Sequence, residues 1–249
     1  MKTSSAVEPR RTPFRSLLSV AVLVLVGCGD AGPEPGTPGS SAPTGTASTS
    51  TPASSADPNT NTIDGEVIGV LDYPAFTLEV PITWSANGAF VTKGSQGVSV
   101  WDVGEVPQDP CHWQGTMSDP GPTVDDLVEA LSTQRYRHAT EPTEVTLSGY
   151  KGRFLELSVP DDWVVTGDAD FEGCDVEPSN GHRDFVSWLG NGEGERYLLV
   201  AGQVELVWIL DVDGQRLVID AIYPPGAADA DRAELMSVAE SIRFTVQAT

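Results

Sequence analysis

The chain has 249 residues, of which 36 are acidic and only 14 are Lys or Arg, so its formal net charge at pH 7 is −22. Binding to a nucleic-acid backbone needs clustered cations that release counterions. No such cluster follows the N-terminal segment, which excludes nucleic acid as an expected partner. The same charge repels anionic lipid headgroups, so attachment to a membrane has to come from a covalent lipid and not from the protein surface.

Residues 1–27 have the pattern of a secretory signal peptide. Four basic side chains and one acid precede residues 17–26, an apolar run of ten residues. This run suits the hydrophobic part of a signal peptide and is too short to cross a hydrocarbon core roughly 30 Å thick as a helix. The pair Arg10-Arg11 matches a twin-arginine signal poorly, which favours the general secretory route.

The apolar run ends in Leu25-Val26-Gly27-Cys28, which has the form of a lipobox, the sequence at which a bacterial lipoprotein is lipidated and cut. We therefore expect the thiol of Cys28 to carry a lipid and the cut to fall after Gly27. This attachment predicts a domain held at the extracytoplasmic face of a bacterial cell membrane, with the membrane itself as one partner.

Residues 28–62 predict a tether. Gly, Pro, Ser, Thr and Ala dominate the segment, and it has no periodic apolar residues. It therefore cannot bury enough surface to offset the entropy lost on folding. As a flexible coil it would have an r.m.s. span of roughly 30–35 Å. Its many Ser and Thr residues are compatible with O-glycosylation.

The three cysteines divide into one and two. With Cys28 lipidated, Cys111 and Cys174 are left outside the reducing cytosol, where a pair is expected to form a disulfide. The alternative is a reactive thiol at Cys111 assisted by the adjacent His112. Neighbouring residues of an extended strand point to opposite faces, which favours the disulfide.

Residues 63–249 are expected to form one globular domain in which strands predominate. Alternating or β-branched segments predict strands at 75–80, 81–84, 97–103, 144–148, 151–159 and 243–246. A turn at Gly149-Tyr150 separates two of them. The clearest local signal is a hairpin, because the apolar segments 204–212 and 215–223 flank Asp213-Gly214, a dipeptide favoured in two-residue turns.

Two helices are expected in the same domain. Residues 122–131 carry apolar side chains at helical spacing, and Thr123 and Asp126 are placed to cap the N-terminus. Residues 229–241 form the second helical pattern. The expected fold class is therefore α+β, an antiparallel sheet covered by helices, with one disulfide.

The order of these elements resembles a known arrangement. Phe76, Leu78, Val80, Pro81 and Trp84 come first, and a helix, the segment 145–152, the late hairpin and the segment 239–244 follow. This order is similar to that of actinobacterial secreted lipoproteins and, more distantly, to the Mog1/PsbP-like α/β/α sandwich. The resemblance implies a binding module without catalysis, and it assigns no site residues.

The sequence has little that indicates catalysis or metal binding. The histidines His112, His138 and His182 are far apart and have no metal-ligand spacing. No nucleophile elbow, phosphate loop or zinc-binding helix motif is present, and no cofactor is expected. Residues 168–173 match the start of a calcium loop, but Ser179 stands where a bidentate Glu is required. A solvated acidic loop is therefore favoured over a metal site.

Asp220 is the candidate buried acid, because it interrupts the apolar strand pattern of residues 217–223. A carboxylate there needs a partner such as an arginine, or its pKa rises. A structural ion pair is favoured over a catalytic role. The six tryptophans are compatible with a sugar-stacking groove, although most of them are expected in the core of a sheet-rich domain.

Together these features predict a lipid-anchored, non-enzymatic surface domain that binds a small apolar ligand or an envelope protein. The first alternative is an envelope hydrolase that uses acids such as Asp168 and Asp220. The second is a calcium-stabilised component of the cell wall.

Overall fold

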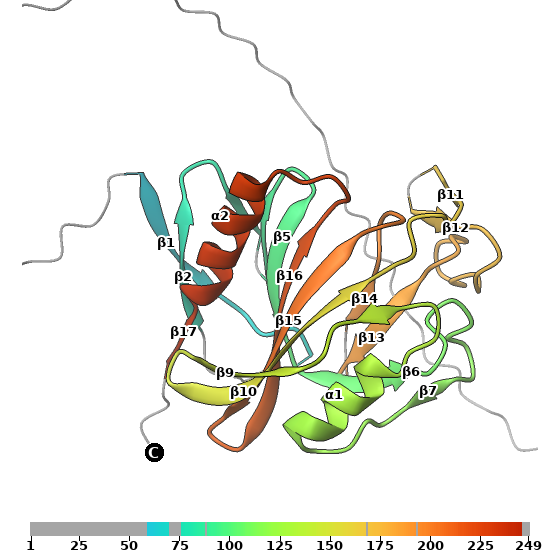
Figure 1. Cartoon of the computed structure of the whole chain (residues 1–249), viewed down its shortest axis with the longest axis horizontal. Helices are drawn as coiled ribbons and strands as arrows, with labels where there is room; N and C mark the ends of the chain where they lie inside the picture. The colour runs from blue at the N-terminus through green and yellow to red at the C-terminus, as the bar shows by residue number, and fades with distance from the viewer. Residues whose placement is uncertain (1–58, 70–75, 88, 168, 193, 246–249) are drawn as a thin grey trace, which may run out of the picture. The chain divides into compact units, whose positions relative to one another are not determined.

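The computed structural model describes residues 59–69, 76–87, 89–167, 169–192 and 194–245 (Figure 1). The lipobox, Cys28, most of the predicted tether and Asp168 lie outside these residues. Strand β1 (Thr60–Gly65) begins inside the segment 28–62 that was assigned to the tether. Its backbone pairs with β2 (Phe76–Pro81), so residues 60–62 belong to a sheet. The polar composition of these residues gave no strand pattern, but the hydrogen bonds between strands join backbone groups and do not require apolar side chains.

The largest sheet, the main sheet, is antiparallel and has eight strands. Seven follow the order β3-β4-β5-β16-β15-β10-β8, and β9 also pairs with β10. The strands are β3 (Ser85–Asn87), β4 (Phe90–Lys93), β5 (Gln96–Trp101), β16 (Gln215–Tyr223), β15 (Val204–Val212), β10 (Tyr150–Ser158), β8 (His138–Ala139) and β9 (Thr143–Leu147).

Three smaller sheets accompany the main sheet. The second sheet has the order β14-β13-β6-β7, a three-stranded sheet has the order β1-β2-β17, and β11 pairs with β12. Their strands are β14 (Glu195–Tyr197), β13 (Val186–Gly190), β6 (Val103–Pro107), β7 (Met117–Ser118), β17 (Arg243–Phe244), β11 (Val165–Thr166) and β12 (Asp170–Phe171).

The predicted hairpin forms the centre of the main sheet. β15 and β16 pair from Val204↔Tyr223 to Val212↔Gln215, which leaves two residues in the turn. Asp213 and Gly214 have φ values of 54° and 87°, the left-handed pair that a type I′ turn requires. Both faces of this hairpin are buried, which accounts for its nearly continuous apolar sequence.

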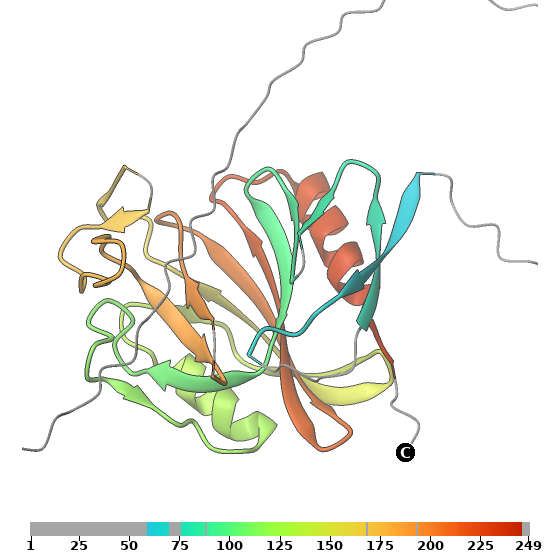
Figure 2. The same ribbon diagram turned by 180° about the vertical axis from the view of Figure 1, so that it is seen from behind.

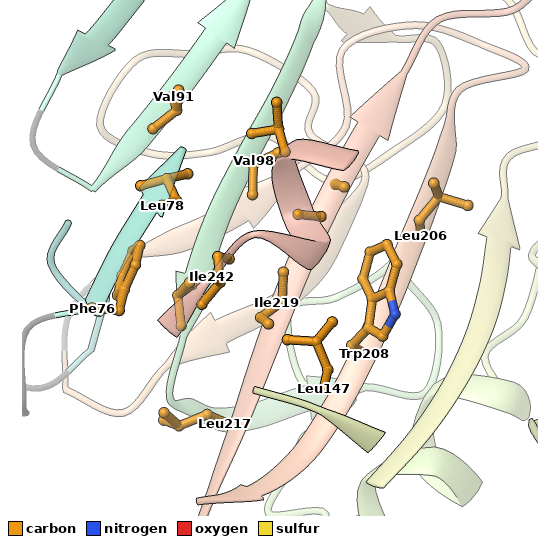
Figure 3. Close-up of a cluster of buried hydrophobic side chains, with 14 of the residues drawn as sticks. Phe76, Leu78, Val91, Val98, Leu147, Leu206, Trp208, Leu217, Ile219 and Ile242 are labelled. Atoms are coloured by element: carbon orange, nitrogen blue, oxygen red, sulfur yellow. The ribbon is translucent and has the colours of Figure 1, made fainter. Parts of the chain in front are cut away.

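One face of the main sheet packs against helix α2 (Asp229–Glu240), the second predicted helix. Every second residue of the central hairpin points to this side, as the period of a strand requires. Figure 3 shows how side chains from β2, β4, β5, β9 and the hairpin gather here beside Ile242. The labelled members are Phe76, Leu78, Val91, Val98, Leu147, Leu206, Trp208, Leu217, Ile219 and Ile242.

The opposite face packs against helix α1 (Val124–Ser132) and the second sheet. Thr123 and Asp126 form the predicted capping box, which satisfies N–H groups of the first turn. Leu127 and Leu131 of α1 join a core that also contains Trp188 of β13. Figures 1 and 2 show α1 beside the strands of the second sheet, and not alone on this face.

The expected fold class is therefore correct in its antiparallel sheet and its disulfide, whereas the expected helical covering needs correction. Each face of the main sheet carries one helix, and strands β6 and β13 cover much of the face on which α1 lies. The domain is dominated by sheets because the segments between α1 and the central hairpin form short strands in place of further helices.

Three expected local structures also differ. Residues 82–84 form a turn, closed by a hydrogen bond from Trp84 N to Pro81 O at 2.9 Å, and no strand. The expected strand 97–103 is divided at Asp102, where the chain leaves the main sheet and enters the second sheet. The turn between β9 and β10 is Ser148-Gly149, both with positive φ, one residue earlier than predicted.

The disulfide between Cys111 and Cys174 is present and confirms the predicted pairing. It lies in a separate small core with Phe171, Phe185 and Leu198. Neither of the two described helices is long and apolar enough to span a membrane.

Candidate functional site

A pocket opens where the second sheet leaves part of the main sheet uncovered. Its floor comes from strands β4, β5 and β16. The register pairs Phe90 with Ser99 and Ser99 with Asp220, so these three side chains point from one row to the same face. In the next row the side chains of Thr92 and Ile222 point to this face on either side of Gly97, which has none.

The wall that faces this floor is formed by β14, an edge strand of the second sheet, and by Leu199, which follows it. The cavity volume is about 190 Å³. We call it the apolar pocket, since apolar atoms make up most of the surface that lines it. The lining residues are Phe90, Thr92, Gly97, Ser99, Trp101, Glu195, Arg196, Tyr197, Leu199, Asp220 and Ile222.

Large apolar side chains surround the mouth of the pocket. Phe90, Tyr197 and Leu199 are 43%, 44% and 40% exposed, although residues of these types are usually buried. Trp101 is buried beneath them, and its ring meets that of Phe90 edge-on with centroids 6.2 Å apart. Trp101 Nε1 donates to Ser99 Oγ at 2.8 Å, which fixes the indole plane. The pocket therefore has a preformed aromatic wall.

The wall made by β14 is held by the disulfide core. Leu198 is fully buried among Phe171, Phe185 and the two cysteines. Leu198 N donates to Phe185 O at 2.9 Å. Because side chains alternate along an extended segment, burying Leu198 turns Tyr197 and Leu199 outward, toward the pocket.

A buried network of charges lies behind the pocket. Arg196 Nε donates to Asp220 Oδ2 at 2.5 Å, and Arg196 Nη2 lies 3.0 Å from Glu205 Oε1. Arg137 Nη2 pairs with the same Glu205 carboxylate, which also accepts from Ser187 Oγ at 3.0 Å. The two arginines and two acids balance in charge, as buried ions require.

The two acids of this network differ in pKa. Burial raises the pKa of Asp220 to about 7, since the attraction of Arg196 offsets only part of the desolvation and the neighbouring Glu205 charge adds to it. Burial also acts on Glu205, but Arg137 and Arg196 together hold its pKa below the ordinary value. Glu205 is therefore the ionised centre of the network.

A third acid, Glu195, lies at the edge of the pocket outside this network. Burial raises its pKa to about 7, and the nearby charges of Glu177 and Asp184 raise it further. Its Oε1 atom is shielded from water and has no hydrogen-bond partner among the described residues. The same holds for Asp220 Oδ1. The pocket is thus bordered by two carboxylates, each with one unpartnered oxygen.

The structure places the candidate residues as follows. Asp220 is 1% exposed, and the arginine beside it is Arg196. Sequence reasoning missed Arg196, Glu195 and Glu205, because a charged residue next to a loop or at a strand end ordinarily indicates solvent. Cys28 and its lipobox lie outside the described residues.

The remaining polar candidates do not meet at the pocket. All three histidines are exposed. Asp170 of the possible calcium loop pairs with Arg183 at 3.4 Å, and within the described ranges no three His, Cys, Asp or Glu side chains are grouped to hold a metal. Trp101 is the one tryptophan in the lining of the pocket, whereas Trp84, Trp188 and Trp208 are buried in the core.

A larger hollow of about 570 Å³ lies between α1 and the β9–β10 hairpin. Three of its four charged groups are already paired, since Arg153 bonds Asp125 at 3.0 Å and lies 3.5 Å from Glu144, whereas Lys151 has no ion pair among the described residues. The apolar pocket is the better candidate because large apolar side chains are exposed around its mouth and one oxygen each of Glu195 and Asp220 has no partner among the described residues.

No protein-family model and no curated protein matches the sequence. Among solved structures, the chain is similar to the solution structure of cyanobacterial PsbP from Synechocystis sp. PCC 6803. The two are 13% identical, the TM-score is 0.35, and the match covers 79% of this chain and 99% of that one. The sequence resembles the same PsbP-like fold, and a likeness at this TM-score carries no argument about fold or activity.

Proposed function

We propose that the chain is a lipid-anchored surface protein whose domain binds an apolar group of a small ligand or of an envelope protein in the apolar pocket. The observation that carries this proposal is the exposed wall of Phe90, Tyr197 and Leu199 above the buried Trp101. Exposed apolar side chains gathered around a hollow are typical of binding sites.

The size of the pocket limits what it accepts. An apolar cavity of about 150 Å³ holds a single benzene, and pockets for drug-sized ligands run from about 300 Å³ upward. At about 190 Å³ the pocket suits one small molecule or one protruding side chain. A larger ligand would place only one group inside and rest the remainder on the exposed wall.

The anchor follows from the lipobox at residues 25–28. The disulfide between Cys111 and Cys174 supports an oxidising compartment outside the cytosol. With a tether between Cys28 and β1, the pocket would be presented some distance from the membrane surface.

Anchoring is tested by fractionating cells that express the chain or its Cys28→Ala variant. We expect the parent chain in the membrane fraction and the variant in the soluble extracytoplasmic fraction. If Cys28→Ala is held at the membrane as firmly as the parent chain, the lipid anchor is wrong.

Binding in the pocket is tested by titrating the full chain with 1-pentanol and following backbone and indole N–H resonances. We expect saturable shifts at Phe90, Trp101 and Tyr197. A Cβ at Gly97 would lie 3.4 Å from Thr92 Cγ2, 3.5 Å from Val91 O and 3.7 Å from Ile222 Cγ1, which are ordinary contacts, so the backbone accepts a Cβ here and Gly97→Val is designed to add bulk to the pocket lining.

Gly97→Val should therefore abolish these shifts. Gly97→Ala adds a smaller group, so it should weaken 1-pentanol binding without abolishing it. Thr146→Val, an exposed change on β9, is the control and should bind as the parent chain does. Shifts that persist unchanged in Gly97→Val would place the binding elsewhere and contradict the proposal.

A hydrolase is the second candidate, because Glu195 and Asp220 border one pocket and both have a pKa near 7. Against it, Asp220 is only 1% exposed and one of its oxygens already accepts from Arg196, which leaves it poorly accessible to a substrate. Hydrolysis of cell-envelope polysaccharide by the purified chain, lost in Glu195→Gln, would favour this candidate.

A further inference from the structure

Charge around the apolar pocket is not balanced. Arg196 is the single cation among the lining residues, and it is already paired with Asp220 and Glu205. Arg137 is likewise occupied by Glu205. Among the described residues Glu195 has no ion pair, and the charges that act on its pKa are those of two further acids, Glu177 and Asp184. The pocket edge therefore carries one carboxylate that lacks a cation.

One oxygen of Glu195 lacks a hydrogen-bond donor. Glu195 Oε1 is shielded from water and has no partner in the described part of the chain. A buried acceptor without a hydrogen bond costs free energy, which a ligand carrying N–H groups would recover. Glu195 is only half-buried, and rotation about its last side-chain torsion has broad freedom, so either oxygen can face the pocket.

The aromatic wall favours the same sign of charge. Phe90, Trp101 and Tyr197 line the pocket on three strands, and the face of an aromatic ring attracts a cation. The buried network behind the pocket, in which Arg196 and Arg137 face Asp220 and Glu205, balances in charge and therefore does not oppose a bound cation.

The volume of the pocket and the need for N–H donors limit which cations it can bind. A volume of about 190 Å³ takes an alkyl chain with a compact head. A quaternary ammonium has no N–H group to offer the unpartnered Glu195 oxygen, whereas a primary ammonium has three. The aliphatic part of such a group would lie against Ile222 and the rings.

We propose that the apolar pocket binds an alkylammonium group, with its alkyl chain against Phe90 and Trp101 and its nitrogen on the carboxylate of Glu195. This inference rests on the proposed function, because it names the group that the pocket accepts. A free alkylamine and the side chain of a lysine on an envelope protein share this chemistry.

The test compares n-pentylammonium with 1-pentanol, which has the same chain and a neutral head. Both are titrated into the full chain at about pH 8, above the pKa of Glu195, and followed by the N–H resonances of the pocket. Both heads can donate a hydrogen bond to the carboxylate of Glu195, but only the ammonium forms an ion pair with it, so we expect n-pentylammonium to bind at least about tenfold more tightly.

Glu195→Gln keeps the shape of the side chain and removes its charge. In this variant the affinity for n-pentylammonium should fall at least about tenfold, to near that of 1-pentanol, whose affinity should fall much less because it carries no charge. The matched control is Glu129→Gln on the exposed side of α1, which should bind both compounds as the parent chain does.

The outcomes separate the two proposals. Equal affinities of the parent chain for the two compounds would overturn the alkylammonium inference and leave the apolar pocket as proposed, and this result needs no variant. Absence of binding by both would overturn the inference and the proposed function together. A further titration with Nα-acetyl-lysine methylamide distinguishes the sources, since binding as tight as that of n-pentylammonium favours a lysine side chain and much weaker binding favours a free amine.

Discussion

Arg196 and Asp220 belong to different sheets, and their side chains join the two. The guanidinium Nε lies 2.5 Å from the carboxylate Oδ2, deep between β14 and β16. Because Arg196 also reaches Glu205, it links the edge strand of the second sheet to the central hairpin of the main sheet. The position of the pocket wall therefore depends on a buried ionic contact.

Arg196→Met should destabilise the domain by about 3–5 kcal/mol, because it leaves Asp220 and Glu205 buried with one cation between them. Urea unfolding followed by circular dichroism measures this loss. The control is Arg183→Met, whose pair with Asp170 is 45% and 29% exposed and should be worth less than about 1 kcal/mol. Equal losses in the two variants would contradict the structural role of Arg196.

Stability should depend on pH through Glu195. Its pKa is raised from 4.5 to about 7, so between these values the folded chain keeps a proton that the unfolded chain has released. The free energy of unfolding therefore falls as pH rises through this window and levels off above it. Because the side chain is half exposed, the fall is on the order of 1–2 kcal/mol and less than the full shift implies.

Glu195→Gln removes this dependence. Its stability relative to the parent chain should rise between pH 5 and pH 7.5, whereas that of Glu129→Gln should stay constant. The shift at Asp220 has the same sign, but it is common to all three proteins and cancels in the comparison. A parallel pH profile for Glu195→Gln and the parent chain would refute the expectation.

Removing the disulfide should act on the pocket as well as on stability. The two cysteines are separated by 63 positions, for which the loss of chain constraint is about 4 kcal/mol. In Cys111→Ala/Cys174→Ala, hydrogen exchange should also accelerate in residues 195–200, since Leu198 packs in the disulfide core. Acceleration spread evenly over the main sheet would show that the disulfide does not hold this segment.

Gly152 should tolerate no side chain. A Cβ at this position of β10 would lie 1.9 Å from Ile209 O, a backbone atom of β15 that cannot move aside. Gly152→Ala should therefore lose about 1–3 kcal/mol or more in urea unfolding. Gly97→Ala is the matched control, because its Cβ meets nothing closer than 3.4 Å and should change stability little. A neutral Gly152→Ala would mean that the two strands are farther apart than described.

The sequence predicted those features that depend on local pattern. Asp213-Gly214 between two apolar runs determined the central hairpin, Thr123 and Asp126 determined the start of α1, and the cysteine count determined the disulfide. The residues that form the hairpin turn and the helix cap are close together in the chain, and with Cys28 set aside only one cysteine pairing was possible. The sequence pattern alone was therefore enough to predict these features.

The pocket could not be predicted in the same way. Glu195-Arg196-Tyr197 is a charged triplet between glycine and leucine residues, and its pattern is typical of a surface loop. Arg196 can be buried because Glu205 and Asp220 pair with it, and these two acids lie on strands further along the chain. Phe90 and Leu199 become neighbours of one hollow only after β14 docks on the main sheet. Such long-range packing leaves no signal in a window of a few residues.

The alternation along residues 195–199 separates two tasks within one short segment. Leu198 faces inward and packs in the core, while Tyr197 and Leu199 are partly exposed, line the pocket and would contact the ligand. Substitutions at the two outward positions can thus alter selectivity with little penalty to folding. Deletion of one residue just before Tyr197 would shift this pattern by one position, placing Leu198 where Tyr197 stood and the tyrosine ring at the buried position of Arg196, beside Asp220 and Glu205.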